Sequence, residues 1–411
     1  MATAAIARPA SRSANLLVLL LGTAIFLNYV DRGAIGIAAP LMSRELGLSP
    51  EAYGVAFSAF FWVYAPVQFF AGRLCDRFSV YALISAGILL WAASTLLTGF
   101  VGGFASLLVL RVMLGVGESI AFPGSTKIIA RHVPTEQRGM ANAIVATGIA
   151  LGPAAGTLAG GLILATWGWR PMFLVFGAIT LLWLGPWRST VRGMTADELA
   201  EAGAPVPVRA LIGRWSLWSM AIVHCLGNYC FYFLIGWLPS FLVKSRGFSL
   251  TEMTLLATIG YAVQAVCALS YGRFSDWWTC SGRSEAACRR WMMVASQTGA
   301  AVAILGMSMT HGAVPIALLL CLAGAASASL SLNLFAIGQM FSGPRAAGTW
   351  MGFQNAVGNA SGIFGSILTG FIVQHAGYDR AFVVTAAIAA VGAVWWALGV
   401  PRIAPIDLVD C

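Results

Sequence analysis

The sequence predicts an all-α membrane protein whose transmembrane helices, about twelve in number, form two pseudo-symmetric six-helix bundles. Three observations support this prediction. Hydrophobic residues make up 59% of the 411-residue chain and charged residues only 9%, whereas a soluble domain carries about 25% charged residues. Apolar runs of about 18 residues or more, the length needed to cross a bilayer, recur from Asn15 to Val400. The second half of the chain also repeats features of the first half.

Each apolar run can be given approximate limits as a membrane-crossing helix. The expected spans are residues 15–40, 51–72, 80–100, 104–129, 139–165, 168–187, 214–243, 250–272, 290–310, 313–341, 347–374 and 379–400. The first of them is too long for the apolar core of a signal peptide, and no convincing cleavage site follows it. We therefore expect it to be retained as the first helix.

The distribution of Lys and Arg predicts the orientation of these helices. With the N-terminus inside, roughly sixteen basic residues fall in cytoplasmic segments and about five fall outside, which is the positive-inside bias of membrane proteins. The five are Arg44, Arg170, Lys244, Arg246 and Arg380. We expect a multi-pass protein of a bacterial inner membrane, in contact with lipid and with both termini in the cytoplasm. The formal charge of +9 therefore indicates topology and not a nucleic-acid partner.

An internal repeat divides the chain into two halves of the same orientation. Shared residues recur at an offset of about 200 residues early in the chain and about 210 later on. They include Asn28-Tyr29 with Asn228-Tyr229, Gly72-Arg73 with Gly272-Arg273, and Arg170 with Arg380. We expect an N-terminal bundle at 1–188, a cytoplasmic central loop at 189–213 and a C-terminal bundle at 214–411. Parallel halves of this kind bind substrate near the bilayer midplane, between the repeats.

Four charged residues lie deep inside the apolar spans. Asp31 is followed directly by Arg32, and Arg111 precedes Glu118 by two helical turns on nearly the same face. A charged side chain at the centre of a spanning helix costs roughly 2.5–3.5 kcal/mol on insertion scales, so it is rare unless it faces a cavity or a partner. Carboxylates exchange protons, and a guanidinium binds a carboxylate through two parallel hydrogen bonds. The four residues therefore predict either a site for protons and an anion or a static buried ion-pair network.

The segment after the second span has the sequence GRLCDRF at residues 72–78. It resembles the loop 2–3 signature of the major facilitator superfamily, although the basic residues usual further along are absent. The likeness implies the fold of that superfamily, with Gly72, Asp76 and Arg77 as gating residues that stabilise the outward-open state. A topological anchor is the alternative interpretation of the same residues.

Four longer motifs resemble the anion:cation symporters of that superfamily, which include bacterial sugar-acid and other organic-anion transporters. They are NYVDR at 28–32, FSAFFWVYAPVQ at 57–68, RVMLGVGESIAFP at 111–123 and NYCFYFLIGWLP at 228–239. The resemblance implies proton coupling by Asp31 and Glu118. It also implies carboxylate binding and charge relay by Arg32 and Arg111, and a place along the substrate path for Tyr29 and Tyr64. Whether Arg111 mainly holds Glu118 or contacts substrate is open.

The second half has amides where the first half has charges. Asn355 and Asn359 are the preferred candidates to bind hydroxyl groups of a polar solute, although amides also hold transmembrane helices together. Members of the family often carry another polar group near Ile149, and its apolar side chain leaves the particular sugar open. His224 is either a proton carrier or a packing residue.

These observations predict a secondary active transporter that symports a small organic anion with protons by alternating access. We expect a sugar acid such as an aldonate, aldarate or hexuronate as substrate, protons as the coupling ion, no other cofactor, and a monomer. A proton-antiporting exporter of a drug or metabolite on the same fold is the alternative, and a non-transporting receptor is a further one. The sequence has no catalytic constellation, CxxC pair or His/Cys cluster that would indicate an enzyme or a metal site.

Overall fold

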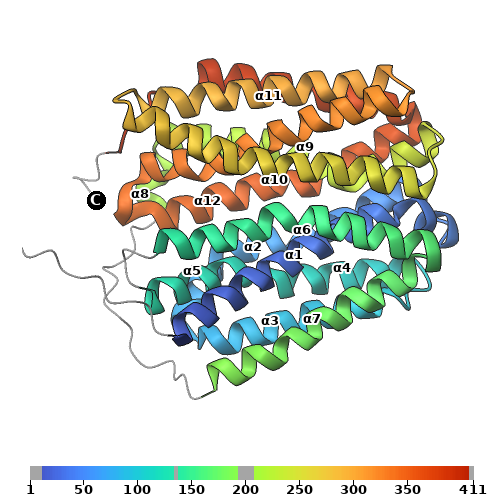
Figure 1. Cartoon of the computed structure of the whole chain (residues 1–411), viewed down its shortest axis with the longest axis horizontal. Coiled ribbons are helices and arrows are strands. Elements are labelled where there is room, and N and C mark those ends of the chain that lie inside the picture. The colour runs from blue at the N-terminus through green and yellow to red at the C-terminus, as the bar shows by residue number, and fades with distance from the viewer. Residues whose placement is uncertain (1–11, 134–137, 193–207, 407–411) are drawn as a thin grey trace, which may run out of the picture.

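The computed structural model of the chain describes residues 12–133, 138–192 and 208–406, and every regular element among them is helical. The helices are α1 (Arg12–Glu45), α2 (Pro50–Arg77), α3 (Val80–Thr98), α4 (Phe104–Glu118), α5 (Ala121–His132), α6 (Arg138–Trp167), α7 (Trp169–Val191), α8 (Val208–Ile212), α9 (Trp215–Ser240), α10 (Leu250–Cys280), α11 (Glu285–Met309) and α12 (Ala313–Val394), with π-helical turns η2 (Phe241–Ser245) and η3 (Trp395–Gly399). Figure 1 shows the long helices running side by side as one bundle.

In the part of the chain that the structure describes, twelve helical segments are long enough to cross a membrane. Among the described residues, ten helices combine the required length with the required hydropathy, and α4 and α5 together count as one of them. The last, Gly348–Gly399, makes two crossings because the chain turns at Gly377, whose φ of 83° is a left-handed conformation that glycine adopts without strain. Helix α2 is the twelfth, since its 28 residues span about 42 Å. The predicted all-α membrane fold is confirmed.

The predicted spans coincide with these helices, but α2 is longer than expected. The prediction placed the motif at 72–78 in a turn after the second span, whereas α2 continues through Arg77 and only Phe78 and Ser79 separate it from α3. The helical hydrogen bonding continues past residue 72, and the Phe78 N–H still donates to Leu74 O. The surroundings of Gly72 and the side chains of Asp76 and Arg77 lie outside the part of the chain that the structure describes, so the gating role of these three residues stays a prediction.

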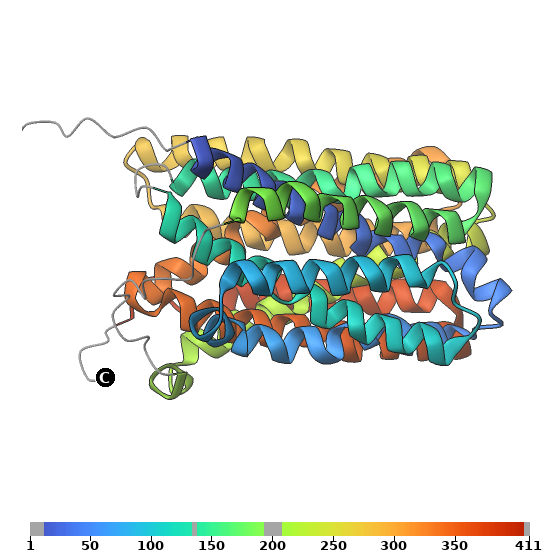
Figure 2. The same cartoon turned by 90° about the horizontal axis from the view of Figure 1, so that it is seen from below.

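The crossings form two groups that lie one above the other in Figure 1. The N-terminal group comprises α1–α7 and the C-terminal group comprises α9–α12. Both ends of the described chain lie at the left of Figures 1 and 2, and we call this the terminal end of the bundle. The opposite end, which includes the turn at 46–49, is called the distal end. Since 193–207 lies outside the described residues, the limits of the predicted domains stay a prediction.

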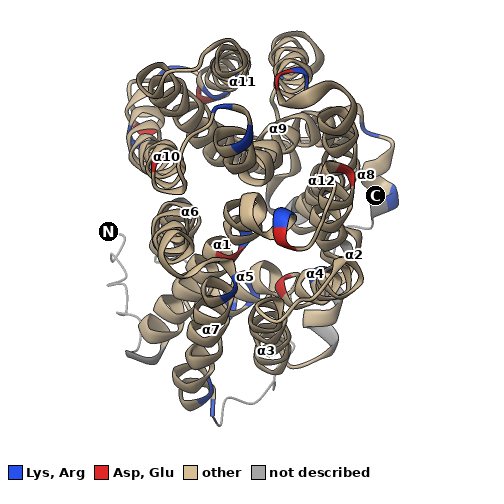
Figure 3. Ribbon diagram, turned by 90° about the vertical axis from the view of Figure 1, so that its right-hand side faces the viewer, with Lys and Arg blue, Asp and Glu red and all other residues tan. Residues whose placement is uncertain are grey.

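The two groups meet along three pairs of helices, α1 with α9, α2 with α12 and α6 with α10. Viewed from the distal end, the ribbons of both groups carry few charged residues (Figure 3). Backbones approach closely in the distal part of the contact. A Cβ atom on Gly36 would lie 2.0 Å from Ile235 O, and one on Gly54 would lie 2.5 Å from Ser366 O. Close helix packing therefore closes the distal end between the two groups, which we call the distal seam.

A row of glycines in α6 fixes the position of α1. Gly148, Gly152 and Gly156 recur every four residues and so lie on one face of the helix. Cβ atoms at these positions would lie 2.7 Å from Gly22 O, 2.6 Å from Tyr29 Cβ and 2.8 Å from Val30 Cα, respectively. Only glycine permits this approach, so the row holds the part of α1 that carries the buried charges against α6.

Candidate functional site

The fourth crossing is interrupted next to a buried acid. Helix α4 ends at Glu118 and α5 begins at Ala121. Pro123 explains the interruption, because it has no N–H to donate to the carbonyl of Ser119 four residues earlier. The Ser119 N–H donates to Val116 O, one position closer than in an α-helix, at 3.4 Å. Glu118 therefore occupies the last position of α4, where it is 1% exposed.

Arg32 of α1 and Glu118 form a buried ion pair. Arg32 Nε donates to Glu118 Oε2 at 3.1 Å, and the two side chains are only 8% and 0% exposed. The same Nε donates to Asn28 Oδ1 at 3.0 Å, and Nη2 donates to Tyr64 OH at 2.6 Å. Asp31, the sequence neighbour of Arg32, takes no part in this pair. Adjacent residues of a helix do not face each other, so the two side chains point to different neighbours.

Aromatic rings surround the Arg32 guanidinium. Its carbon lies 5.0 Å from the ring centroid of Tyr29, 5.4 Å from that of Phe60 and 4.7 Å from that of Tyr64. These distances are within the range of favourable cation–π contacts. Nη1 forms no hydrogen bond among the described residues, whereas Nε and Nη2 are both engaged. Arg32 is therefore held in place with one nitrogen left over for an external anion.

Arg111 of α4 lies on the other side of the same aromatic group. Its Nη2 donates to the carbonyl of Phe57 at 3.2 Å, and its guanidinium carbon lies 5.6 Å and 5.1 Å from the rings of Phe57 and Phe60. Its Nε is buried without a partner in the described part of the chain. Within that part no hydrogen bond joins Arg111 to Glu118, so Arg111 also has donors available for a ligand.

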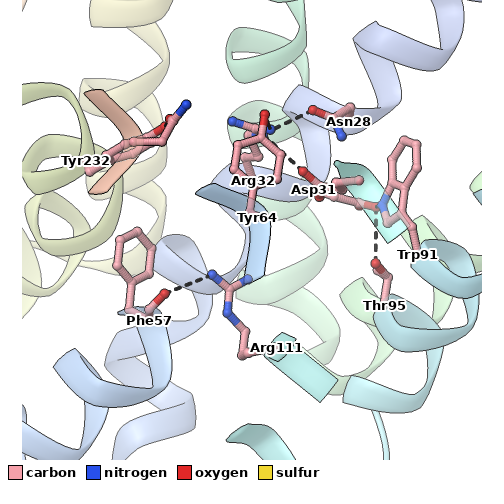
Figure 4. Close-up of polar contacts among 11 residues, drawn as sticks. Asn28, Asp31, Arg32, Phe57, Tyr64, Trp91, Thr95, Arg111 and Tyr232 are labelled. Atoms are coloured by element: carbon pink, nitrogen blue, oxygen red, sulfur yellow. Dashed lines mark hydrogen bonds and ion pairs between the residues drawn. The ribbon is translucent and has the colours of Figure 1, made fainter. Parts of the chain in front are cut away.

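Asp31 points away from these groups, toward α3 (Figure 4). Its Oδ2 accepts from Trp91 Nε1 at 2.5 Å and from Thr95 Oγ1 at 3.2 Å. The residue is 3% exposed. The four buried charges therefore do not form a single cluster, because Arg32, Glu118 and Arg111 surround one space and Asp31 lies behind it.

That space is a narrow pocket between the two groups of helices, with a cavity volume of about 10 Å³. A cavity of this size holds about one water molecule, so the two groups of helices must move apart before the pocket can accept a solute. The residues that line it are Arg32, Phe57, Phe60, Phe61, Arg111, Glu118, Tyr232 and Ile235. The last two belong to α9 of the C-terminal group and the others to α1, α2 and α4. Two guanidiniums against one carboxylate give the pocket a net positive charge, which favours an anion.

Tyr232 connects the pocket to the amides of the C-terminal group. Its hydroxyl donates to Asn359 Oδ1 at 2.5 Å, and Asn359 Nδ2 donates to Asn355 O at 2.9 Å. Asn355 Nδ2 in turn donates to Gln68 Oε1 of α2 at 2.7 Å, a hydrogen bond between the two groups. The two predicted amides thus lie next to the pocket, behind Tyr232, and are not part of its lining.

His224 and the predicted path residues have different surroundings. Tyr29 and Tyr64 are both in contact with Arg32, as described above. His224 is 2% exposed and packs against Phe335, with ring centroids 5.9 Å apart. It does not line the pocket, and this favours the packing interpretation. No group of three or more His, Cys, Asp or Glu in the described ranges is placed to hold a metal ion.

Sequence reasoning missed several residues of this site. Phe60 and Tyr232 lie inside motifs that carry the family resemblance, but nothing in the motifs assigns them to a pocket. Trp91 and Thr95 could have indicated their contact with Asp31, because they are four residues apart and lie on one face of a largely apolar helix. Hydrogen-bond donors on the same face of a buried helix require acceptors, and Asp31 is that acceptor.

A bundle of membrane-crossing helices in two pseudo-symmetric groups, with a small charged pocket between them, defines the class of secondary transporters. The chain matches the sequence profile of the Major Facilitator Superfamily at residues 21–284 and 281–407. It belongs to that superfamily and is a multi-pass membrane transporter, not an enzyme.

The similar proteins of known name are anion transporters. The chain is 30% identical over 388 residues to a probable sulfoacetate transporter of Cupriavidus necator, covering 90% of each chain. It is 27% identical over 391 residues to the hexuronate transporter of Bacillus subtilis, covering 90% of this chain and 91% of that one. Among solved structures, an inward-facing and occupied bacterial homologue of the human lysosomal transporter Spinster is similar, with a TM-score of 0.76, 19% identity, and coverage of 94% of this chain and 97% of that one. The last similarity shows the fold alone.

Proposed function

We propose that the protein is a proton-coupled symporter that imports a small organic anion, namely a sugar acid such as an aldonate, aldarate or hexuronate. The observation that carries the proposal is the hydrogen bonding of the Arg32 guanidinium. One of its nitrogens is bound to Glu118, and another has no partner among the described residues, in a pocket that also contains Arg111. A carboxylate that enters this pocket meets a guanidinium fork already held in position. The relatives that transport hexuronate and sulfoacetate agree with a small anionic substrate.

Competition for Arg32 provides the coupling. Ionised Glu118 neutralises Arg32 and so weakens its attraction for a second anion. Protonation of Glu118 removes this competitor and frees the guanidinium for the substrate carboxylate. After the substrate leaves, Arg32 again favours ionised Glu118 and the proton is released. Proton and substrate therefore promote the binding of each other, which is the linkage that symport requires.

Alternating access is supported by the unequal closure of the two ends. At the distal seam, backbones of the two groups are in direct contact, and the Tyr53 hydroxyl donates to Gly236 O at 2.8 Å. On the terminal side, the contact between Asn355 and Gln68 joins the groups through side chains. We propose that the terminal end faces the cytoplasm of a bacterial cell, as the basic residues predict. Rocking of the two groups then opens the distal seam to admit substrate from outside.

The C-terminal group is suited to recognise hydroxyl groups. Tyr232, Asn359 and Asn355 form a chain of neutral donors and acceptors next to the pocket. A sugar acid has a carboxylate for the guanidinium side and hydroxyls for this amide side. Uncharged hydrogen-bonding groups distinguish substrates strongly, because an analogue that lacks a partner leaves a buried polar group unpaired.

Transport in liposomes tests the proposal. Purified full-length protein is reconstituted with an alkaline interior and an acidic exterior, and uptake of radiolabelled glucuronate is compared with uptake of galactonate and sulfoacetate. Symport predicts accumulation above the external concentration for at least one hydroxylated acid, and loss of this accumulation when a protonophore is added. Accumulation that requires an acidic interior instead would indicate antiport and overturn the proposal.

A further inference from the structure

Asp31 is held by two donors from α3, a helix that contributes nothing to the lining of the pocket. Trp91 is 0% exposed and Thr95 is 3% exposed, so water does not compete for either bond. Two charged residues neighbour this group: Arg32, next to it in α1, and Glu118 of α4, which interacts with Asp31 electrostatically. No ion pair to Asp31 is formed within the described ranges. Asp31 is therefore a buried acid with neutral partners only.

The two oxygens of Asp31 have different environments. Oδ2 accepts both hydrogen bonds, whereas Oδ1 is buried and has no partner among the described residues. An indole N–H can only donate, so Oδ2 remains an acceptor whether or not the acid carries a proton. The proton of the neutral acid consequently belongs on Oδ1. A carboxyl group with one oxygen fixed and one free can gain and lose a proton without changing its position.

We propose that Trp91 and Thr95 are positioning residues that hold Asp31 as a second proton-binding group, separate from the substrate pocket. This proposal rests on the proton coupling proposed above and extends it by giving the two acids, Glu118 and Asp31, different roles in the transport cycle. Glu118 shares Arg32 with the substrate, so its protonation changes substrate affinity. Asp31 does not line the pocket, so its protonation changes the rate of the transport cycle and leaves substrate affinity nearly constant.

The test removes one donor at a time from full-length protein in liposomes. Trp91→Phe keeps an aromatic ring without the N–H, and Thr95→Val keeps the shape of the side chain without the hydroxyl. In each variant the pH of half-maximal proton-driven uptake should move upward by about one unit, because the ionised carboxylate has lost a hydrogen bond. The maximal rate should fall, and the KM for the transported acid should change less than about threefold. Thr95→Ser restores a hydroxyl and should restore the wild-type pH profile.

Trp187→Phe is the matched control. Trp187 is 0% exposed and its Nε1 donates to Ser85 Oγ of α3 at 3.0 Å, so the variant removes the same kind of bond from the same helix without touching Asp31. An unchanged pH profile is expected. An equal shift in Trp187→Phe, or a raised KM with an unshifted profile in both Trp91→Phe and Thr95→Val, would overturn the positioning role. Failure of the wild-type protein to take up substrate with protons would instead contradict the proposed function itself.

Discussion

The two groups of helices place different chemistry at equivalent positions of the pocket. Arg32 and Tyr232 each follow a copy of the repeated Asn-Tyr pair, at 28–29 and at 228–229, and both line the pocket. Arg32 is bound to a carboxylate, that of Glu118. Tyr232 is bound to the amide of Asn359. The N-terminal group therefore supplies charge and the C-terminal group supplies neutral hydrogen bonds.

The distal corners of the two groups, in contrast, are built alike. In the N-terminal group, Arg170 at the start of α7 forms an ion pair of 2.9 Å with Glu45 at the end of α1. Arg170 also donates to the carbonyls of Gly99 and Val101, at 3.1 Å and 2.9 Å. One arginine thus ties together the first helix, the last helix and the loop after α3.

The corner of the C-terminal group has the same connections with the charges exchanged. Arg246, after the first crossing of that group, forms an ion pair of 2.7 Å with Asp379 at the start of the last crossing. It donates to the carbonyls of Met307 and Ser308, at 3.1 Å and 2.8 Å. In the N-terminal group the acid, Glu45, lies on the first crossing, and in the C-terminal group the acid, Asp379, lies on the last crossing. An ion pair nevertheless joins the first and last crossings in both groups.

The contrast separates structural positions from functional ones. Joining a helix corner is possible with either order of charges, and both groups achieve it. In the pocket, only the N-terminal group contributes charged residues. Because the C-terminal group folds into a similar bundle without charged residues at this position, folding of a bundle does not require them. Changes in the pocket are therefore expected to alter transport, and changes at the corners are expected to alter stability alone.

Glu118→Gln tests the charged side of the pocket and should have the largest effect. Glutamine keeps the size of the side chain and an acceptor for Arg32, but it does not exchange a proton. Proton-driven uptake should fall to passive equilibration, while exchange of labelled for unlabelled substrate continues. Uptake and counterflow in liposomes measure the two activities. Asp31→Asn should likewise abolish proton-driven accumulation and leave substrate exchange intact. Accumulation at the wild-type level in either variant would contradict the role of the substituted acid in proton coupling.

The sequence was sufficient for the crossings but not for the contacts between them. Span length and hydropathy are set by the bilayer, so even the crossings of α12, divided at Gly343 and Gly377, were predicted as separate spans. The partner of Glu118 was not predictable, because it depends on the rotation of α1 relative to α4. Packing between helices sets that rotation, through features such as the glycine row of α6 against α1. For the same reason the sequence did not show that Trp91 and Thr95 of α3 hold Asp31.

Arg32→Lys tests the same side with a smaller expected effect. Lysine keeps the charge but has a single nitrogen, so it does not hold Glu118, Tyr64 and a substrate carboxylate in fixed directions at once. Substrate affinity should fall about ten- to a hundredfold, as measured by calorimetric titration of the purified protein. Arg111→Lys sharpens the comparison. A larger loss in that variant would make Arg111 the main substrate contact, and unchanged affinity in both would contradict anion binding by the guanidiniums.

Tyr232→Phe tests the neutral side of the pocket. Loss of the hydroxyl removes the bond to Asn359 and should weaken binding of a hydroxylated sugar acid by about tenfold. Binding of an anion without hydroxyls, such as sulfoacetate, should change little. Tyr64→Phe is the control, because the Tyr64 hydroxyl is bound to Arg32 and its loss should affect both anions equally. Equal losses for both anions in Tyr232→Phe would contradict the division between a charged and a neutral side.

Substitutions at the distal corners should have the smallest effects and should leave transport intact. Glu45→Gln and Asp379→Asn remove acids whose side chains are 50% and 55% exposed. Exposed ion pairs contribute about 0.2–1 kcal/mol, so each variant should lower the melting temperature by no more than about 2 °C. Differential scanning fluorimetry and the substrate KM measure the two outcomes.

The two corner arginines differ in burial, so their substitutions should differ in their effect on stability. The Arg246 side chain is only 1% exposed, while that of Arg170 is 35% exposed. Arg246→Met leaves two carbonyls without their donor in a buried setting and should reduce stability more than Arg170→Met does. Neither variant should change the KM of a protein that still folds, because both corners lie away from the pocket. A corner variant that lowers substrate affinity as much as Arg32→Lys would show that the corners take part in transport, and the separation drawn from the two groups of helices would then be wrong.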